Sequence, residues 1–227
     1  MTDLLPPADE GLYEPLLRPA WRLGHLGQSL DGFIGTAGGR GDVINGAENL
    51  DHLHRLRALA DAVVVGAGTV AADDPQLTVR RVPGRNPVRV VIDPRGALEP
   101  GHRLFQDGAA PTLQASLAPG RAPGLAERLT VAEREGTLSL ADLVEQLAAR
   151  GLARIFVEGG GVTVSRFLAA GQLDRLQLCV APLLLGGGKR GLGLPPAGRM
   201  AEAWRAPCRC WRMGPDVLFD FDLAAQG

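Results

Sequence analysis

A glycine-rich turn followed by polar side chains stands out in the middle of the chain. An apolar run, Ala62–Val65, predicts a buried strand, and the sequence Gly-Ala-Gly follows it. Glycines let the backbone turn tightly and let a ligand approach it closely. Thr69, the acidic pair Asp73 and Asp74, and Arg80 come next. Open α/β sheets build ligand sites in this way at strand ends, although the acidic pair also fits a plain turn.

A second glycine turn, Gly159–Gly161, lies between an apolar run at 154–157 and a helical pattern. Its backbone N–H groups and the helix dipole would favour an anion such as a pyrophosphate. The spacing is not a full G-x-G-x-x-G, so a standard Rossmann fingerprint is not supported. A tight strand-to-helix turn therefore stays open as the alternative. Glu158 ends the strand, where it either points into the crevice or caps the following helix.

Other candidate residues have plainer explanations. Arg57 closes a helix predicted over 47–60, where it suits the helix dipole as well as a ligand. His52 and His54 are two apart and face different directions, so we expect no metal site there. His25 lies in a predicted strand and is expected to be a hydrogen-bonded core residue. Neither a G-x-S-x-G elbow nor the zinc-deaminase motifs are present.

Composition narrows the class of protein. The chain has 227 residues and a net charge of -1, which argues against a nucleic-acid surface. No apolar run approaches the roughly 20 residues that span a bilayer, and the first residues lack a signal-peptide pattern. Cys179, Cys208 and Cys210 suit a reducing compartment, and the C-x-C spacing indicates two structural thiols on one strand face. We therefore expect a cytoplasmic protein that binds neither nucleic acid nor a membrane.

Strands alternate with helices along most of the chain. Residues 1–19 are expected to form a loose arm, and residues 20–227 a single domain. Asn45 is the expected N-cap of the helix at 47–60, and Ser139 that of a helix at 140–150. We expect the following strands: 21–29, 62–65, 88–92, 154–157, 176–181, 204–212 and 217–223. This order predicts an α/β fold with three layers, whose mixed, mainly parallel sheet has an antiparallel C-terminal edge.

Seven ordered segments resemble the pyrimidine reductase domain of riboflavin biosynthesis, a relative of dihydrofolate reductase. Each segment alone is a weak signal, but the order and spacing hold from about residue 21 to 223, which makes the set specific. The segments are Gln28–Gly32, His54–Ala58, Val65–Arg80, Val88–Asp93, Val157–Gly160, Phe167–Asp174 and Ala181–Gly186.

The resemblance implies hydride transfer from NADPH to C1′ of a ribosylamino-pyrimidine 5′-phosphate, which gives the ribitylamino product. It places the cofactor against Val43, Thr69, Asp73, Pro94, Gly160, Gly161, Val162, Thr163, Val164, Ser165 and Arg166. It places the substrate against Gly41, Arg57, Leu77, Arg80 and Glu158. Either water or Asp73 would supply the proton.

The chemistry of these residues fits that reaction. Arg57 and Arg80 could hold the substrate phosphate through paired N–H groups. Glu158 could accept hydrogen bonds from the amide and amino groups of the pyrimidine. Arg95 is our own candidate for the 2′-phosphate of NADPH, because an arginine fork matches phosphate oxygens.

The chain departs from the family pattern in one loop. Gly41 and Val43 stand where the family has a serine and a tryptophan, and Val162 stands where it has a proline. The loss of a hydroxyl and an aromatic ring leaves two alternatives open: a reductase of the same fold for another substrate, such as a pterin, or a non-catalytic NADP-binding module. No deaminase half precedes the domain in this sequence, so a separate deaminase or another pathway order would supply the substrate.

Two further expectations come from the same resemblance. Relatives of the dihydrofolate reductase type have a cis peptide between paired glycines, so we expect one between Gly159 and Gly160. Relatives are also homodimers, and the C-terminal region with Trp204 and Trp211 could form the interface; core tryptophans are the alternative.

Overall fold

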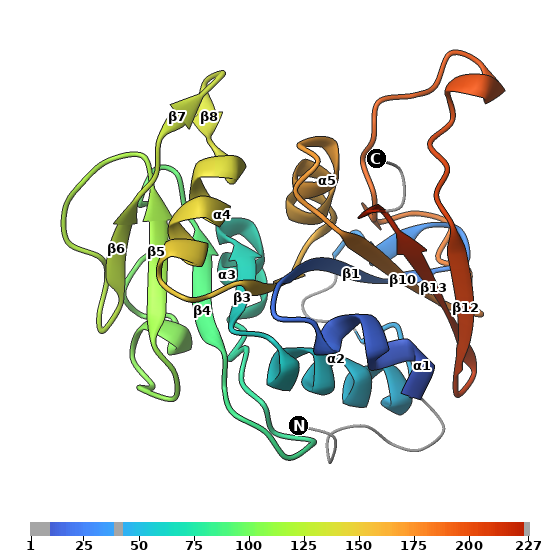
Figure 1. Cartoon of the computed structure of the whole chain (residues 1–227), viewed down its shortest axis with the longest axis horizontal. Helices are drawn as coiled ribbons and strands as arrows, with labels where there is room; N and C mark the ends of the chain where they lie inside the picture. The colour runs from blue at the N-terminus through green and yellow to red at the C-terminus, as the bar shows by residue number, and fades with distance from the viewer. Residues whose placement is uncertain (1–9, 39–42, 225–227) are drawn as a thin grey trace.

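A single nine-stranded sheet forms the centre of the computed structural model, which describes residues 10–38 and 43–224 (Figure 1). Its strand order is β12-β13-β10-β1-β9-β3-β4-β5-β6. The strands are β1 (Trp21–Ser29), β3 (Ala62–Gly66), β4 (Val88–Ile92), β5 (Thr112–Ser116), β6 (Glu127–Thr130), β9 (Arg154–Glu158), β10 (Arg175–Ala181), β12 (Cys208–Met213) and β13 (Asp216–Asp222).

The strand directions match the predicted fold class. All neighbouring pairs from β10 to β6 run parallel. β13 runs antiparallel to both β10 and β12, at the C-terminal edge. The mainly parallel sheet with an antiparallel edge is therefore confirmed. Two short antiparallel pairs lie outside it: β2 (Phe33–Gly35) with β11 (Lys189–Arg190), and β7 (Glu133–Arg134) with β8 (Thr137–Leu138).

Helices cover both faces of the sheet (Figure 1). On one face, α2 (Ala47–Leu59) contributes Leu56 and Leu59 to a buried cluster. On the other face, α4 (Leu140–Ala149) and α5 (Gly161–Ala169) contribute Leu143, Leu147 and Phe167 to a second cluster. The three-layer arrangement follows from these two apolar clusters, one on each side of the strands.

The segment before β1 is more ordered than expected. Residues 1–9 lie outside the described part of the chain, but α1 (Glu10–Tyr13) and the 3-10 helix η3 (Glu14–Leu17) pack against the sheet. Leu12, Tyr13 and Leu16 are buried in the first cluster, and the Trp21 indole donates to the Leu16 carbonyl at 2.9 Å. A loose arm is therefore wrong for residues 10–17, because their apolar side chains complete the core.

Two local expectations at helix starts have different outcomes. Ser139 caps α4, as predicted, by accepting a hydrogen bond from the Asp142 amide. Asn45 does not cap α2: the cap is Gly46, whose amide donates to Asp216. The Asn45 side chain instead donates to the Cys179 carbonyl at 3.1 Å. A contact with β10, far away in sequence, thus takes precedence over the local cap.

The turn after β3 also differs from the expectation. The glycine-containing stretch forms a short helix, α3 (Ala67–Asp73), which ends at Asp74 with a left-handed backbone (φ 41°).

Among the residues that the structure describes, no helix is long and apolar enough to cross a membrane.

Candidate active site

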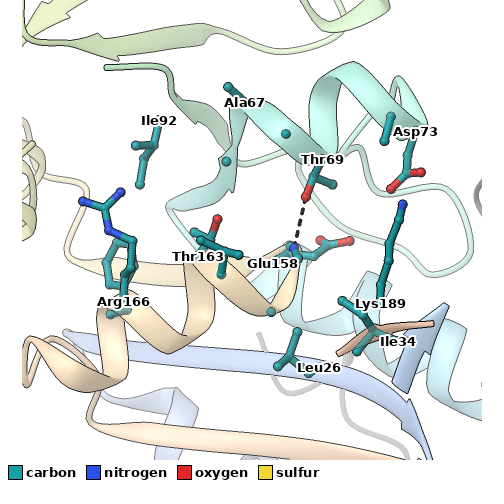
Figure 2. A pocket seen from close by; sticks show the side chains of 18 of the residues that line it. Leu26, Ile34, Ala67, Thr69, Asp73, Ile92, Glu158, Thr163, Arg166 and Lys189 are labelled. Atoms are coloured by element: carbon teal, nitrogen blue, oxygen red, sulfur yellow. Dashed lines mark hydrogen bonds between the residues drawn. The ribbon is translucent and has the colours of Figure 1, made fainter. Parts of the chain in front are cut away.

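A cavity of about 850 Å³ opens where β1, β3 and β9 end and α5 begins (Figure 2). Its volume falls within the range of about 300–1,000 Å³ that is typical of small-molecule sites. The two glycine turns singled out in the sequence, 66–69 and 159–161, both line it. The carboxyl ends of these parallel strands meet at one edge of the sheet, which is where open α/β sheets place ligands.

Thr69 and Gly160 join the two turns. The Gly160 amide donates to the Thr69 hydroxyl oxygen at 3.0 Å (dashed in Figure 2). Gly161, the first residue of α5, lies directly under the backbone of Gly191. A Cβ on Gly161 would stand 1.8 Å from the Gly191 carbonyl oxygen, so only glycine fits there.

The expected cis peptide between Gly159 and Gly160 is wrong, since the described residues contain no cis peptide bond. The backbone of Gly160 is extended, with φ -61° and ψ 157°. This conformation leads the chain from β9 into α5, with the Gly160 amide directed at Thr69.

Arg57 and Glu158 form a two-pronged ion pair beside the cavity. The Arg57 Nε donates to Glu158 Oε2 at 2.7 Å, and Nη2 donates to Oε1. The third guanidinium nitrogen, Nη1, donates to the Thr78 carbonyl at 3.0 Å. Burial acts to lower the pKa of Arg57, but the Glu158 carboxylate outweighs it and leaves this pKa raised. Glu158 is therefore held in one orientation at the cavity wall.

The ion pair does not fit the expectation that Arg57 and Arg80 together hold the substrate phosphate. The guanidinium of Arg57 is engaged with Glu158 and Thr78, and Arg57 is not among the residues that line the cavity. Arg80 is exposed, and its Nη1 donates to the Thr78 hydroxyl at 2.6 Å. The structure thus does not bring Arg57 and Arg80 together as two free phosphate ligands.

Of two further expected ligand contacts, Leu77 lies in the core and Asp73 lines the cavity. The Leu77 side chain is only 2% exposed and packs in the first core cluster, so it does not reach the cavity. Its backbone has φ 55°, which is unusual for leucine. Asp73 is exposed and lines the cavity at the end of α3, consistent with contact to a ligand.

The expected cofactor residues divide into two groups. Those that line the cavity are Thr69, Asp73, Pro94, Gly160, Gly161, Val162, Thr163 and Arg166. Those outside its lining are Val43, Arg95, Val164 and Ser165. Val164 is a core residue, and the Ser165 hydroxyl accepts a hydrogen bond from the Gly193 amide. Gly41 lies outside the described residues.

Sequence reasoning missed several lining residues, among them His25, Leu53, Lys189 and Arg190. His25 is buried, as expected, but it also borders the cavity, since β1 places it opposite Glu158 of β9. Its Nε2 lies 3.1 Å from the Asn49 side-chain oxygen. Burial lowers the pKa of His25 to about 4, although the Asn49 hydrogen bond acts in the opposite direction.

The described residues contain no group of three or more histidine, cysteine or acidic side chains that could hold a metal ion. The cavity wall instead combines glycine backbone, hydroxyls, cationic side chains and one fixed carboxylate. These groups suit a phosphate-bearing ligand with a polar ring better than they suit a metal.

The sheet and this site define an α/β domain with a ligand cavity at the carboxyl ends of its parallel strands. The chain belongs to the RibD C-terminal domain family, whose model matches residues 24–218. The predicted family is thereby confirmed.

Two curated relatives and one solved structure show the extent of the likeness. The chain is 38% identical over 206 residues to the 2,5-diamino-6-ribosylamino-4(3H)-pyrimidinone 5′-phosphate reductase of Methanothermobacter thermautotrophicus, covering 86% of this chain and 94% of that protein. It is 34% identical over 208 residues to the riboflavin biosynthesis protein RibD of Escherichia coli, covering 85% of this chain but 57% of that protein. The structure of a deaminase/5-amino-6-(5-phosphoribosylamino)uracil reductase from Thermotoga maritima superposes with a TM-score of 0.75 at 26% identity, covering 92% of this chain and 58% of that one.

Proposed function

We propose that this chain reduces a ribosylamino-pyrimidine 5′-phosphate to the ribitylamino product, with NADPH as the reductant. The observation that carries the proposal is Glu158, held by Arg57 at the wall of a cavity that also contains the start of α5. The relative from Methanothermobacter is named for this class of substrate, and the match covers 94% of that relative.

The residues of the cavity fit a dinucleotide cofactor. The amides of Gly161 and Val162 begin α5, and amides at a helix start favour a pyrophosphate. Gly160, just before the helix, carries no side chain that would cover its backbone, and Thr69 and Thr163 add hydroxyls nearby. When bound, NADPH supplies the hydride, while the protein supplies position and charge.

In this proposal the substrate binds at the end of the cavity near Glu158. A fixed carboxylate accepts hydrogen bonds from the amide and amino groups of a pyrimidine. The sugar then lies toward Asp73, which is exposed at the cavity wall and can exchange a proton with the substrate. Reduction at C1′ would release the sugar ring oxygen from that carbon, and Asp73 or water would supply the proton that this oxygen takes up.

The test is NADPH oxidation, followed by absorbance, on addition of the ribosylamino-pyrimidine phosphate, with the product identified by mass. We expect oxidation with this substrate and none with a dihydropterin. Turnover of the pterin instead would favour the alternative, a reductase of the same fold for another substrate. The changed residues Gly41 and Val43 are the sequence feature that favours this alternative. Cofactor binding without any turnover would favour a non-catalytic module.

We also propose that the protein is a homodimer joined at the face of β13. Val217, Phe219 and Phe221 alternate along this strand with buried residues, and they lie opposite Val180, Leu178 and Leu176 of β10. Trp204 is 44% exposed, with its ring 6.1 Å from that of Phe221. Sedimentation should give a dimer for the wild type and a monomer for Phe219→Asp; a monomeric wild type would refute the proposal.

A further inference from the structure

Lys189 is the only lysine in the chain, and it lines the cavity. It lies in residues 185–193, which we call the strap because they cross from β2 to the start of α5. No motif in the sequence marked this residue as part of the site.

The strap is tied down at its first end. The Asp31 carboxylate accepts hydrogen bonds from the backbone amides of Leu185 at 3.1 Å and Gly186 at 2.7 Å. β11 then pairs with β2, where Lys189 stands opposite Gly35. These contacts fix the backbone of the residues that precede Lys189.

The strap is equally well held beyond Lys189. The Gly191 amide donates to the Gly32 carbonyl at 3.0 Å, and the Gly193 amide donates to the Ser165 hydroxyl at 2.8 Å. Between them, the Gly191 carbonyl packs on Gly161 at the start of α5. Lys189 is thus presented to the cavity by a backbone that is fixed on both sides.

The side chain of Lys189 extends along the cavity. Figure 2 shows the side chain extending from β11 in the direction of Asp73, on the same side of the cavity as Glu158. The other two cations of the lining are engaged: Arg166 donates to the Thr137 hydroxyl at 2.5 Å, and Arg190 lies over the Phe33 ring. Within the described part of the chain, the ammonium group of Lys189 forms neither a hydrogen bond nor an ion pair.

We infer that Lys189 binds a phosphate group of the ligand in this cavity; the inference rests on the proposed function. Arg57 is engaged with Glu158, and neither Arg57 nor Arg80 lines the cavity, so a phosphate bound there needs a different cation. Lys189 supplies a compact charge of the kind that binds phosphate. The phosphate belongs either to the cofactor pyrophosphate or to the substrate, and these two sources can be separated by experiment.

The first test measures NADP⁺ binding by calorimetry and the Michaelis constant for the pyrimidine substrate, in wild type and Lys189→Met. We expect one of the two constants to rise about 10-fold, the usual effect of a lost charge-assisted hydrogen bond. A change in the NADP⁺ constant assigns the cofactor phosphate, and a change in the substrate constant assigns the substrate phosphate. Lys189→Arg should retain most of the binding, and Arg134→Met, which removes an exposed cation on β7, should leave both constants unchanged.

If wild type binds NADP⁺ and turns over substrate while Lys189→Met changes neither constant, the inference about Lys189 is overturned and the proposed function stands. If wild type binds no NADP⁺ at all, the proposed function itself fails. The two failures are therefore distinguishable.

A chemical test uses the single lysine. Pyridoxal 5′-phosphate followed by borohydride should modify Lys189, which peptide mapping separates from the amino terminus. Saturating NADP⁺ or substrate should protect this residue from modification, whichever carries the phosphate. Equal labelling with and without both ligands would contradict a ligand contact at Lys189.

Discussion

Arg57 of α2 and Glu158 of β9 face each other across 101 positions of sequence and form a two-pronged ion pair at the cavity wall. Their side chains are 9% and 16% exposed, so water screens the pair only slightly. Arg57 fixes the orientation of Glu158, and of the two only Glu158 lines the cavity.

Separating the pair should affect stability and activity differently. Arg57→Met leaves a largely buried carboxylate without its partner and should lower the free energy of unfolding by about 3 kcal/mol. Glu158→Gln keeps the shape of the side chain but removes the charge, so kcat/KM should fall about 100-fold while NADP⁺ binding is retained. Urea unfolding and steady-state kinetics measure the two effects. Full activity in Glu158→Gln would show that the carboxylate does not bind the pyrimidine.

Gly161 should not tolerate a side chain. Gly161→Ala places a Cβ 1.8 Å from the Gly191 carbonyl oxygen, which must move the strap or the start of α5. We expect a loss of about 2 kcal/mol in the free energy of unfolding, as for other overpacked sites, together with weaker NADP⁺ binding. Gly101→Ala is the matched control, because a Cβ there meets nothing within 4 Å. Equal melting temperatures for the two variants would contradict the prediction.

Stability should fall in mild acid because buried histidines resist protonation, and His25 and His52 are the two most buried of three. Burial lowers the pKa of His25 to about 4 and that of His52 to about 3, from an unfolded value of about 6.5. Between these values the unfolded state binds more protons, so the free energy of unfolding is highest above about pH 6.5 and falls as the pH drops. Each histidine adds a slope of up to about 1.4 kcal/mol per pH unit.

Urea unfolding of the double variant His25→Gln/His52→Gln, at several pH values, provides the check. The carboxylates contribute equally to both proteins, so the difference in slope isolates the two histidines. An identical slope in wild type and double variant would show that these side chains do not titrate differently on folding.

Local signals predicted most of the framework. The apolar runs at 62–65, 88–92 and 154–157 became central strands, since each is short, β-branched and bounded by turn residues. The Ser139 cap was correct because its partner, the Asp142 amide, lies only three residues away. Short helix α3 was missed, because its glycine and threonine read as a turn.

The site was predicted less completely, because its geometry depends on strand order. Glu158 and the glycine turn were found as motifs, whereas the engagement of Arg57 required α2 to cross β9. His25 reached the cavity only because β1 pairs with β9. Lys189 gave one signal, its uniqueness as a lysine, but its position depends on the pairing of β11 with β2.

Arg95 remains our candidate for the residue that selects NADPH over NADH. It directly follows Pro94, which lines the cavity at the end of β4, and its own side chain is exposed beyond that lining. A guanidinium there can reach a 2′-phosphate at the rim through paired hydrogen bonds. Arg95→Ala should therefore lower the preference for NADPH about 10-fold, with NADH use unchanged, as measured by kcat/KM for each cofactor. Arg134→Ala, which removes an exposed arginine of β7 outside the cavity lining, should leave the preference intact. An unchanged ratio in Arg95→Ala would assign the 2′-phosphate to another residue, and Arg166, the arginine of α5 inside the cavity, would be the next to substitute.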